Sequence, residues 1–179
     1  QKSKTKIDFI SIEGCPPDKQ DVAAVLRAFP ELRDVYDEFL QQWPRRWLGV
    51  HHMSFLNGQI SLHLHYGQAE QVLPTLDFSA HIWFLDGFSP QKCPEIWTYE
   101  FLSKLKNKIK YEGCLITYTS SAAVRKSLKN LGFNLFNIVP THSNKNRWSN
   151  GTLATFDNQQ NNPYVTQLSE MEIEHLKTK

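Results

Sequence analysis

The sequence has no long hydrophobic run and only three cysteines, and both absences narrow the class of protein. No stretch of the 179 residues approaches the 18 apolar residues of a membrane-spanning helix, so no membrane association is expected. The first six residues, QKSKTK, lack the apolar core of a secretory signal peptide. The cysteines are far apart and show no CxxC spacing, which argues against a disulfide framework and against a metal site. We therefore expect a cytoplasmic protein without a bound metal.

The composition is that of a globular protein, but its charge is unevenly distributed. Hydrophobic residues make up 40% of the chain and charged residues 21%, which suits one domain with a sizeable core. Between Ser103 and Trp148 there are nine Lys or Arg residues and one acid, Glu112, although the whole chain carries only +2. Such a segment suggests a face for a polyanion. A solvated helix face is an equally good explanation, because the lysines at 104, 106, 108 and 110 adjoin a helical pattern.

Segments with strand and helix character alternate along the chain, which predicts an α/β fold with a mostly parallel sheet covered on both faces. The Asn57-Gly58 pair predicts a hairpin turn, and the last two strands, with no helix between them, predict an antiparallel edge hairpin. We expect a polar leader at 1–6, the domain at 7–156 and a polar, loose tail at 157–179. Strands are expected at 7–13, 50–66 (the hairpin), 80–86, 113–119, 134–139 and 151–156. Helices are expected from Asp18, at 31–43, at 69–76, from Pro94 and at 121–132. In the helix from Pro94, the residues expected to face inward are Ile96, Tyr99, Leu102, Leu105 and Ile109.

Two of the expected strands end on an acid, Glu13 and Asp86. In open α/β sheets, ligands bind beyond the carboxyl ends of the strands. A carboxylate after the second strand of a nucleotide-binding sheet is well placed for ribose hydroxyls. Taken alone, however, each acid is better explained as a polar strand end or a helix cap.

The stretch WFLDGFSPQKCPEIWT, residues 83–98, closely resembles the pattern LDGFxPxKNPxMW of one family. This family is the methyltransferase domain of the bacterial tRNA 5-methylaminomethyl-2-thiouridine biosynthesis protein. The similarity extends from about Ile7 to Phe156. It includes FISIEGCP, the hairpin WPRRWLGVHHMSFLNGQISLHLHYG, and YEGCLITYTSSAAVRKSLKNLGF.

The resemblance implies a Rossmann-like class I fold that uses S-adenosylmethionine and methylates the aminomethyl group of a wobble uridine in tRNA. It also implies an FAD-dependent oxidase domain or protein as a partner that acts earlier. This chain has no dinucleotide-binding glycine motif, so FAD is not expected on it.

The resemblance also assigns roles to residues. Asp86 and Phe88 are the expected catalytic pair, because a carboxylate can accept a hydrogen bond from the amine and an aromatic ring can stack on the uracil. Glu13, Gly67, Gln68 and Asp86 are expected to bind the cofactor. Core packing is the favoured alternative for Trp97. The residues expected to contact the substrate or tRNA are Pro90, Lys92, Trp97, Arg125, Lys126, Lys129, Lys145 and Arg147.

Three features depart from the family pattern. The family's first strand and its glycine-rich loop, of the type GFGTGLNF, have no counterpart in these residues, so we expect weak or absent cofactor binding. A sheet without that strand must pair its second and fourth strands differently, leave an edge, or recruit another chain. Gln68 stands where the family usually has an acid. Cys93 replaces an asparagine and is expected to be an inert packing residue.

Two other functions remain open at this point. One is a non-catalytic remnant that binds tRNA or a partner, and the other is a methyltransferase of small amines. His63 and His65 share one face of a strand, but no third metal ligand with suitable spacing is visible, so a solvated hairpin face is favoured over a metal site.

Overall fold

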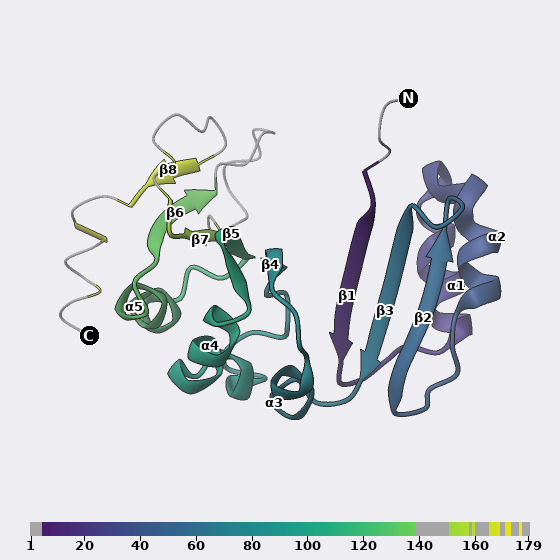
Figure 1. The fold of residues 1–179 in the computed structure, drawn as a ribbon, viewed down its shortest axis with the longest axis horizontal. Coiled ribbons are helices and arrows are strands. Elements are labelled where there is room, and N and C mark those ends of the chain that lie inside the picture. The colour runs from purple at the N-terminus through teal and green to yellow at the C-terminus, as the bar shows by residue number, and fades with distance from the viewer. Residues whose placement is uncertain are drawn as a thin grey trace. The chain divides into compact units, whose positions relative to one another are not determined.

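The computed structural model describes residues 5–138, 151–157, 159, 165–168, 171, 172 and 176. The chain divides into two compact units, Gln1–Thr75 and Leu76–Lys179. Each unit is built on its own sheet (Figure 1).

The first unit contains a three-stranded sheet in the order β1 (Ile7–Glu13), β3 (Ile60–Tyr66), β2 (Gly49–Phe55). β1 runs parallel to β3, and β2 runs antiparallel to it. The predicted hairpin is confirmed, but its loop, 56–59, is longer than a two-residue turn, since Phe55 pairs with Ile60. Leu56, Asn57 and Gly58 in this loop have φ values of 52°, 55° and 78°.

Two helices of the first unit, α1 and α2, lie together on one side of this sheet (Figure 1). Its hydrophobic core contains Met53, Leu64 and Tyr66, against which Phe39 and Trp43 pack. The helical segments are α1 (Lys19–Arg27), the 3-10 turn η1 (Pro30–Leu32), α2 (Arg33–Gln42), α3 (Ala69–Val72) and the 3-10 turn η2 (Leu73–Thr75). Among the described residues, no helix combines the length and apolar character that a membrane span requires.

The second unit contains a five-stranded sheet. Its order is β4 (Ala80–Phe84), β5 (Ile109–Thr117), β7 (Thr152–Thr155), β6 (Asn134–Ile138), β8 (Val165–Gln167). β4 and β5 are parallel, and the other pairs are antiparallel, including the predicted closing pair β6–β7. The expected mostly parallel sheet is therefore present only in part, in the β1–β3 and β4–β5 pairs of the described strands.

One predicted helix is divided in two. Pro94–Trp97 forms a 3-10 turn, η3, and the α-helix α4 begins at Tyr99 and ends at Lys106. The break lies at Thr98, which is extended and accepts a hydrogen bond at Oγ1 from the Phe101 backbone N–H. Placing Tyr99 on the inner face was wrong, because it is 52% exposed. The buried side chains of α4 are Phe101, Leu102 and Leu105, and Ile109 begins β5.

The tail is not loose where the structure describes it. β8 pairs antiparallel with β6, and the side chains of Leu168 and Leu176 are buried. The predicted helix at 121–132 is confirmed as α5 (Ala122–Asn130), which packs beside α4.

Among the described strands, each sheet has two edge strands, β1 and β2 in the first and β4 and β8 in the second. β1 pairs only with β3, and β4 pairs only with β5. Ile7 and Phe9 on β1 are exposed, as are Ile82 and Phe84 on β4. β1 and β4 are thus edge strands among the residues that the structure describes.

Candidate functional site

The turn after β4 brings Asp86 and Phe88 to the surface. The backbone N–H of Leu85 donates to Ile116 O at 2.9 Å, which continues the β4–β5 ladder up to the turn. Asp86 then leaves the sheet with an exposed side chain, and Phe88 is 70% exposed. Because β4 and β5 are parallel, the residues that follow both strands lie at the same edge. An exposed carboxylate and an exposed ring therefore share one edge of the second unit.

Gly87, between these two residues, packs closely on η3. A Cβ added at Gly87 would collide with Cδ1 of Ile96. A larger residue at position 87 would therefore have to displace the end of the Ile96 side chain, and glycine avoids this contact.

Tyr118 belongs to this cluster and was missed by the sequence analysis. It directly follows β5, and its hydroxyl donates a hydrogen bond to Gly87 O at 3.0 Å. Burial raises the pKa of Tyr118, and the nearby charge of Asp86 raises it further. The sequence feature that could have identified Tyr118 is an aromatic residue at the carboxyl end of the strand next to β4.

Trp97 is buried and contacts the turn that carries Asp86 and Phe88 from the interior of the second unit. It is 6% exposed, and its Nε1 donates to Phe88 O at 2.8 Å. The rings of Trp97 and Tyr118 meet edge to face, with centroids 6.2 Å apart. This placement agrees with the core-packing alternative for Trp97.

Pro90 and Lys92 follow in a second tight turn. The backbone N–H groups of Lys92 and Cys93 donate to Ser89 O at 2.8 and 3.0 Å. Pro90 is half-buried, and Lys92 is exposed beside the turn. None of the cysteines, Cys15, Cys93 and Cys114, forms a disulfide.

Three of the predicted cofactor residues, Glu13, Gly67 and Gln68, come together in the first unit, at the carboxyl ends of β1 and β3. The Gly67 N–H donates to Glu13 O at 3.0 Å, and the Gln68 side chain lies against Gly14. One carboxylate oxygen of Glu13 accepts from the Cys15 N–H at 3.2 Å, and Gln68 is exposed. A carboxylate beside an exposed amide offers the acceptors and donors that suit the hydroxyls of a ribose, so this set fits a nucleoside cofactor.

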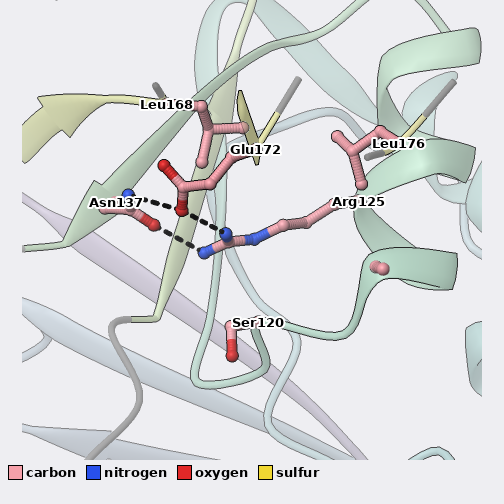
Figure 2. A pocket seen from close by; sticks show the side chains of 7 residues that line it. Ser120, Arg125, Asn137, Leu168, Glu172 and Leu176 are labelled. Carbon is pink, nitrogen blue, oxygen red and sulfur yellow. Dashed lines mark hydrogen bonds and ion pairs between the residues drawn. The ribbon is translucent and has the colours of Figure 1, made fainter. Parts of the chain in front are cut away.

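Arg125 is held inside the second unit. It is 6% exposed, and its guanidinium donates to Thr152 Oγ1 at 2.8 Å and to Asn137 Oδ1 at 2.7 Å. Figure 2 shows it reaching Glu172 as well, at 3.5 Å. Burial lowers the pKa of Arg125, and Glu172 opposes this effect. A phosphate contact by Arg125 would require this network to open.

The Arg125 network lines a pocket of about 340 Å³. Its wall combines Ser120, Asn137 and Glu172 with the apolar side chains of Leu168 and Leu176 (Figure 2). The residues from the tail thus form one side of the pocket.

Most lysines around the end of α4 contact neighbouring groups. Lys104 pairs with Glu100 at 3.0 Å on the same helix, which agrees with a solvated helix face. The Nζ of Lys106 donates to Leu131 O at 2.6 Å, and that of Lys108 donates to Leu76 O. Lys110 Nζ lies 3.1 Å from His81 Nε2. Lys126 is half-buried and Lys129 is exposed on α5, while Lys145 and Arg147 lie outside the described residues.

Two of the histidines, His52 and His63, form a cross-strand pair. His52 Nδ1 and His63 Nδ1 are 2.6 Å apart across β2 and β3. The part of the chain that the structure describes contains no group of three or more side chains able to hold a metal ion.

Comparison with known proteins gives consistent matches. A family model described as S-adenosyl-L-methionine-dependent methyltransferase matches residues 30–156. The chain is 36% identical over 135 residues to the tRNA 5-methylaminomethyl-2-thiouridine biosynthesis bifunctional protein MnmC of Leptospira borgpetersenii, covering 75% of the chain and 21% of that protein. It is 32% identical over 157 residues to the protein of the same name from Campylobacter concisus, covering 88% of the chain and 25% of that protein. The chain therefore spans about a fifth to a quarter of the length of these curated relatives.

A solved structure supports the fold. The chain matches MnmC2 from Aquifex aeolicus with a TM-score of 0.65 and 24% identity, over 98% of this chain and 59% of that one. The family model covers well over half of the 179 residues. The chain thus belongs to the family of S-adenosyl-L-methionine-dependent methyltransferases.

Proposed function

We propose that this chain takes part in tRNA modification by methylating the aminomethyl group of a wobble uridine. The observation that carries the proposal is the pairing of an exposed carboxylate, Asp86, with an exposed aromatic ring, Phe88, at one sheet edge. The names of the curated relatives, which refer to 5-methylaminomethyl-2-thiouridine in tRNA, support the choice of substrate.

Each residue of the pair has a distinct role in this proposal. The cofactor supplies an electrophilic methyl group when it is bound. Asp86 accepts a hydrogen bond from the amine and orients its lone pair, while Phe88 stacks on the uracil and keeps water away. The exposure of both side chains supports these roles, because a base turned out of a tRNA loop can reach them from solvent.

Glu13, Gly67 and Gln68 are proposed to hold the ribose and adenine of the cofactor, and Asp86 to lie near its positive charge. We further propose that the 179-residue polypeptide binds S-adenosylmethionine weakly, because these residues offer few backbone N–H groups to it. Calorimetry on this polypeptide tests the point, and micromolar affinity would contradict it. Glu13→Ala should weaken whatever binding is measured, by about 1.5–3 kcal/mol for lost bonds to a charged group.

The proposed partner is tRNA, with Pro90 and Lys92 near the reacting base and the basic residues Lys126, Lys129, Lys145 and Arg147 on its phosphates. The FAD-dependent oxidase that would generate the aminomethyl group is proposed to be a separate domain or protein.

The test of the proposed chemistry is Asp86→Asn. If Asp86 also takes the proton that the amine loses on methylation, single-turnover methylation of tRNA carrying an aminomethyl uridine should fall by about 10²–10⁴-fold, the range typical of general-base assistance. The matched control is Asp77→Asn, another exposed aspartate of the second unit, which should keep its activity. Near-normal turnover by a folded Asp86→Asn protein would exclude a catalytic role for the carboxylate and leave it only a structural role at the end of the strand.

A further inference from the structure

The direction of Phe88 depends on two peptide planes. The plane before its Cα carries Gly87 O, and the plane after it carries Phe88 O. Rotation of the first plane changes φ of Phe88, and rotation of the second changes ψ. Groups that hold both carbonyls therefore fix the direction of the Cα–Cβ bond of Phe88 and restrict the side-chain rotamers open to its ring.

Two side chains hold these two carbonyls. The Tyr118 hydroxyl donates to Gly87 O at 3.0 Å, and Trp97 Nε1 donates to Phe88 O at 2.8 Å. They come from different elements, since Tyr118 follows β5 and Trp97 ends η3. Each peptide plane beside Phe88 is thus tied to the body of the second unit.

The two donors are themselves held in place. Trp97 is buried, and the edge-to-face contact of its ring with that of Tyr118 limits the rotation of both. Gly87 adds a third constraint, because the turn packs directly on Ile96. An exposed ring such as Phe88 would otherwise be free to adopt several directions, and stacking on a base requires one.

We infer that Tyr118 is a positioning residue that, together with Trp97, sets the direction of Phe88 for stacking on the target base. The role of Phe88 rests on the proposed function, whereas the clamp itself rests on the contacts of Tyr118 and Trp97. Tyr118 does not act on the base itself; it acts through Phe88.

The first test is a double-mutant cycle with Tyr118→Phe, which removes one hydroxyl and keeps the ring against Trp97. In the wild-type background, kcat for tRNA methylation should fall about 3- to 10-fold, as expected for the loss of one neutral hydrogen bond, with KM little changed. In a Phe88→Ala background the same substitution should change kcat less than about 2-fold. Equal losses in both backgrounds would overturn the inference.

The matched control is Tyr99→Phe, since Tyr99 is also a surface tyrosine of the second unit and lies on α4. It should leave kcat unchanged in both backgrounds. If the wild-type protein methylates no tRNA, the proposed function fails. If the wild-type protein is active but the double-mutant cycle shows equal losses in both backgrounds, only the inference about Tyr118 fails.

The second test does not depend on turnover. Amide hydrogen exchange in residues 86–92 should become faster in Tyr118→Phe while the unfolding midpoint stays close to that of the wild type. Tyr99→Phe should not change the exchange rate of these amides. Unchanged exchange in Tyr118→Phe would show that the hydroxyl holds nothing, and would overturn the inference even for an inactive polypeptide.

Discussion

His65 carries a pH dependence that can be measured at a single residue. Its pKa is lowered from 6.5 by burial and then by its neighbours His63 and His52. The β1 residues paired with His63 and His65 are Ile10 and Ile12, which do not titrate. Folded His65 therefore binds a proton less readily than unfolded His65, so its contribution to stability is present above about pH 6.5 and is lost as the pH falls.

NMR titration of the imidazole protons measures this directly. His65 should titrate below 6.5, and His63→Gln should move its pKa part of the way back, because burial remains the larger cause. A His65 pKa at or above 6.5 in the folded protein would contradict the prediction.

Residue-level interpretation of the sequence predicted some of the candidate site residues and missed others. Asp86 and Phe88 were identified because a strand that ends on an acid and a family motif mark them, and both are exposed as a surface site requires. Tyr118 was missed because its contact with Gly87 O spans 31 residues and depends on the β4–β5 register. Arg125 could be recognised as basic, but its burial comes from Thr152 and Asn137, which only the folded sheet brings near.

At the level of elements, α4 and α5 differ in how they begin. Thr98 caps α4 through a hydrogen bond from the Phe101 N–H at 3.1 Å, whereas Ser121 makes no side-chain cap bond at α5. Thr98→Ala should therefore lower the free energy of unfolding of the second unit by about 1 kcal/mol. Ser121→Ala, the matched control in the same unit, should cost less than about 0.5 kcal/mol. Urea unfolding measures the free energy of unfolding of both variants, and an equal loss in the two would contradict the prediction.

The tail is attached to the second unit through the Arg125 network. Arg125→Gln should destabilise this unit by about 3 kcal/mol, because buried partners lose a charged donor. Glu172→Gln should cost at most about 1 kcal/mol, since its side chain is 42% exposed and its contact with Arg125 is 3.5 Å long. Thermal unfolding of both variants tests this order, and the reverse order would place the main anchor on Glu172.

Elements were easier to predict than their ends. The strands at 7–13 and 80–86 and the hairpin at Asn57-Gly58 follow from apolar runs and turn residues, which act locally. The division of the helix at Thr98 was missed because the apolar spacing continues through it, although Thr98 follows the end of η3 and its side chain caps the start of α4. β8 was missed because its residues Val165–Gln167 are too few to show a pattern and pair with β6, far away in the sequence.

For the whole molecule, the uneven charge predicts a salt-dependent interaction. Lys126→Glu combined with Lys129→Glu should weaken tRNA binding, and the slope of log affinity against log salt should become less steep, because fewer counterions are released. Lys104→Glu is the control, since Lys104 already pairs with Glu100 and should affect binding less. Filter binding at several salt concentrations measures this, and an affinity independent of salt would exclude phosphate contacts by the basic segment.

The α/β class was predictable because it depends on alternating strand and helix patterns, and the family match at 30–156 agrees with it. The proportion of parallel strand pairs was not predictable, because it depends on which strands become neighbours in the folded sheets. The division into two units follows from long-range contacts that no single segment encodes.

The unpaired edge of β4 has a consequence for how this polypeptide behaves in concentrated solution. Its exposed Ile82 and Phe84 lie on a strand whose free backbone groups can template a further strand. This five-residue strand should therefore promote association between copies, and turbidity on storage should rise with protein concentration. Ile82→Lys would place a charge on this edge and should reduce the turbidity that develops at a given protein concentration.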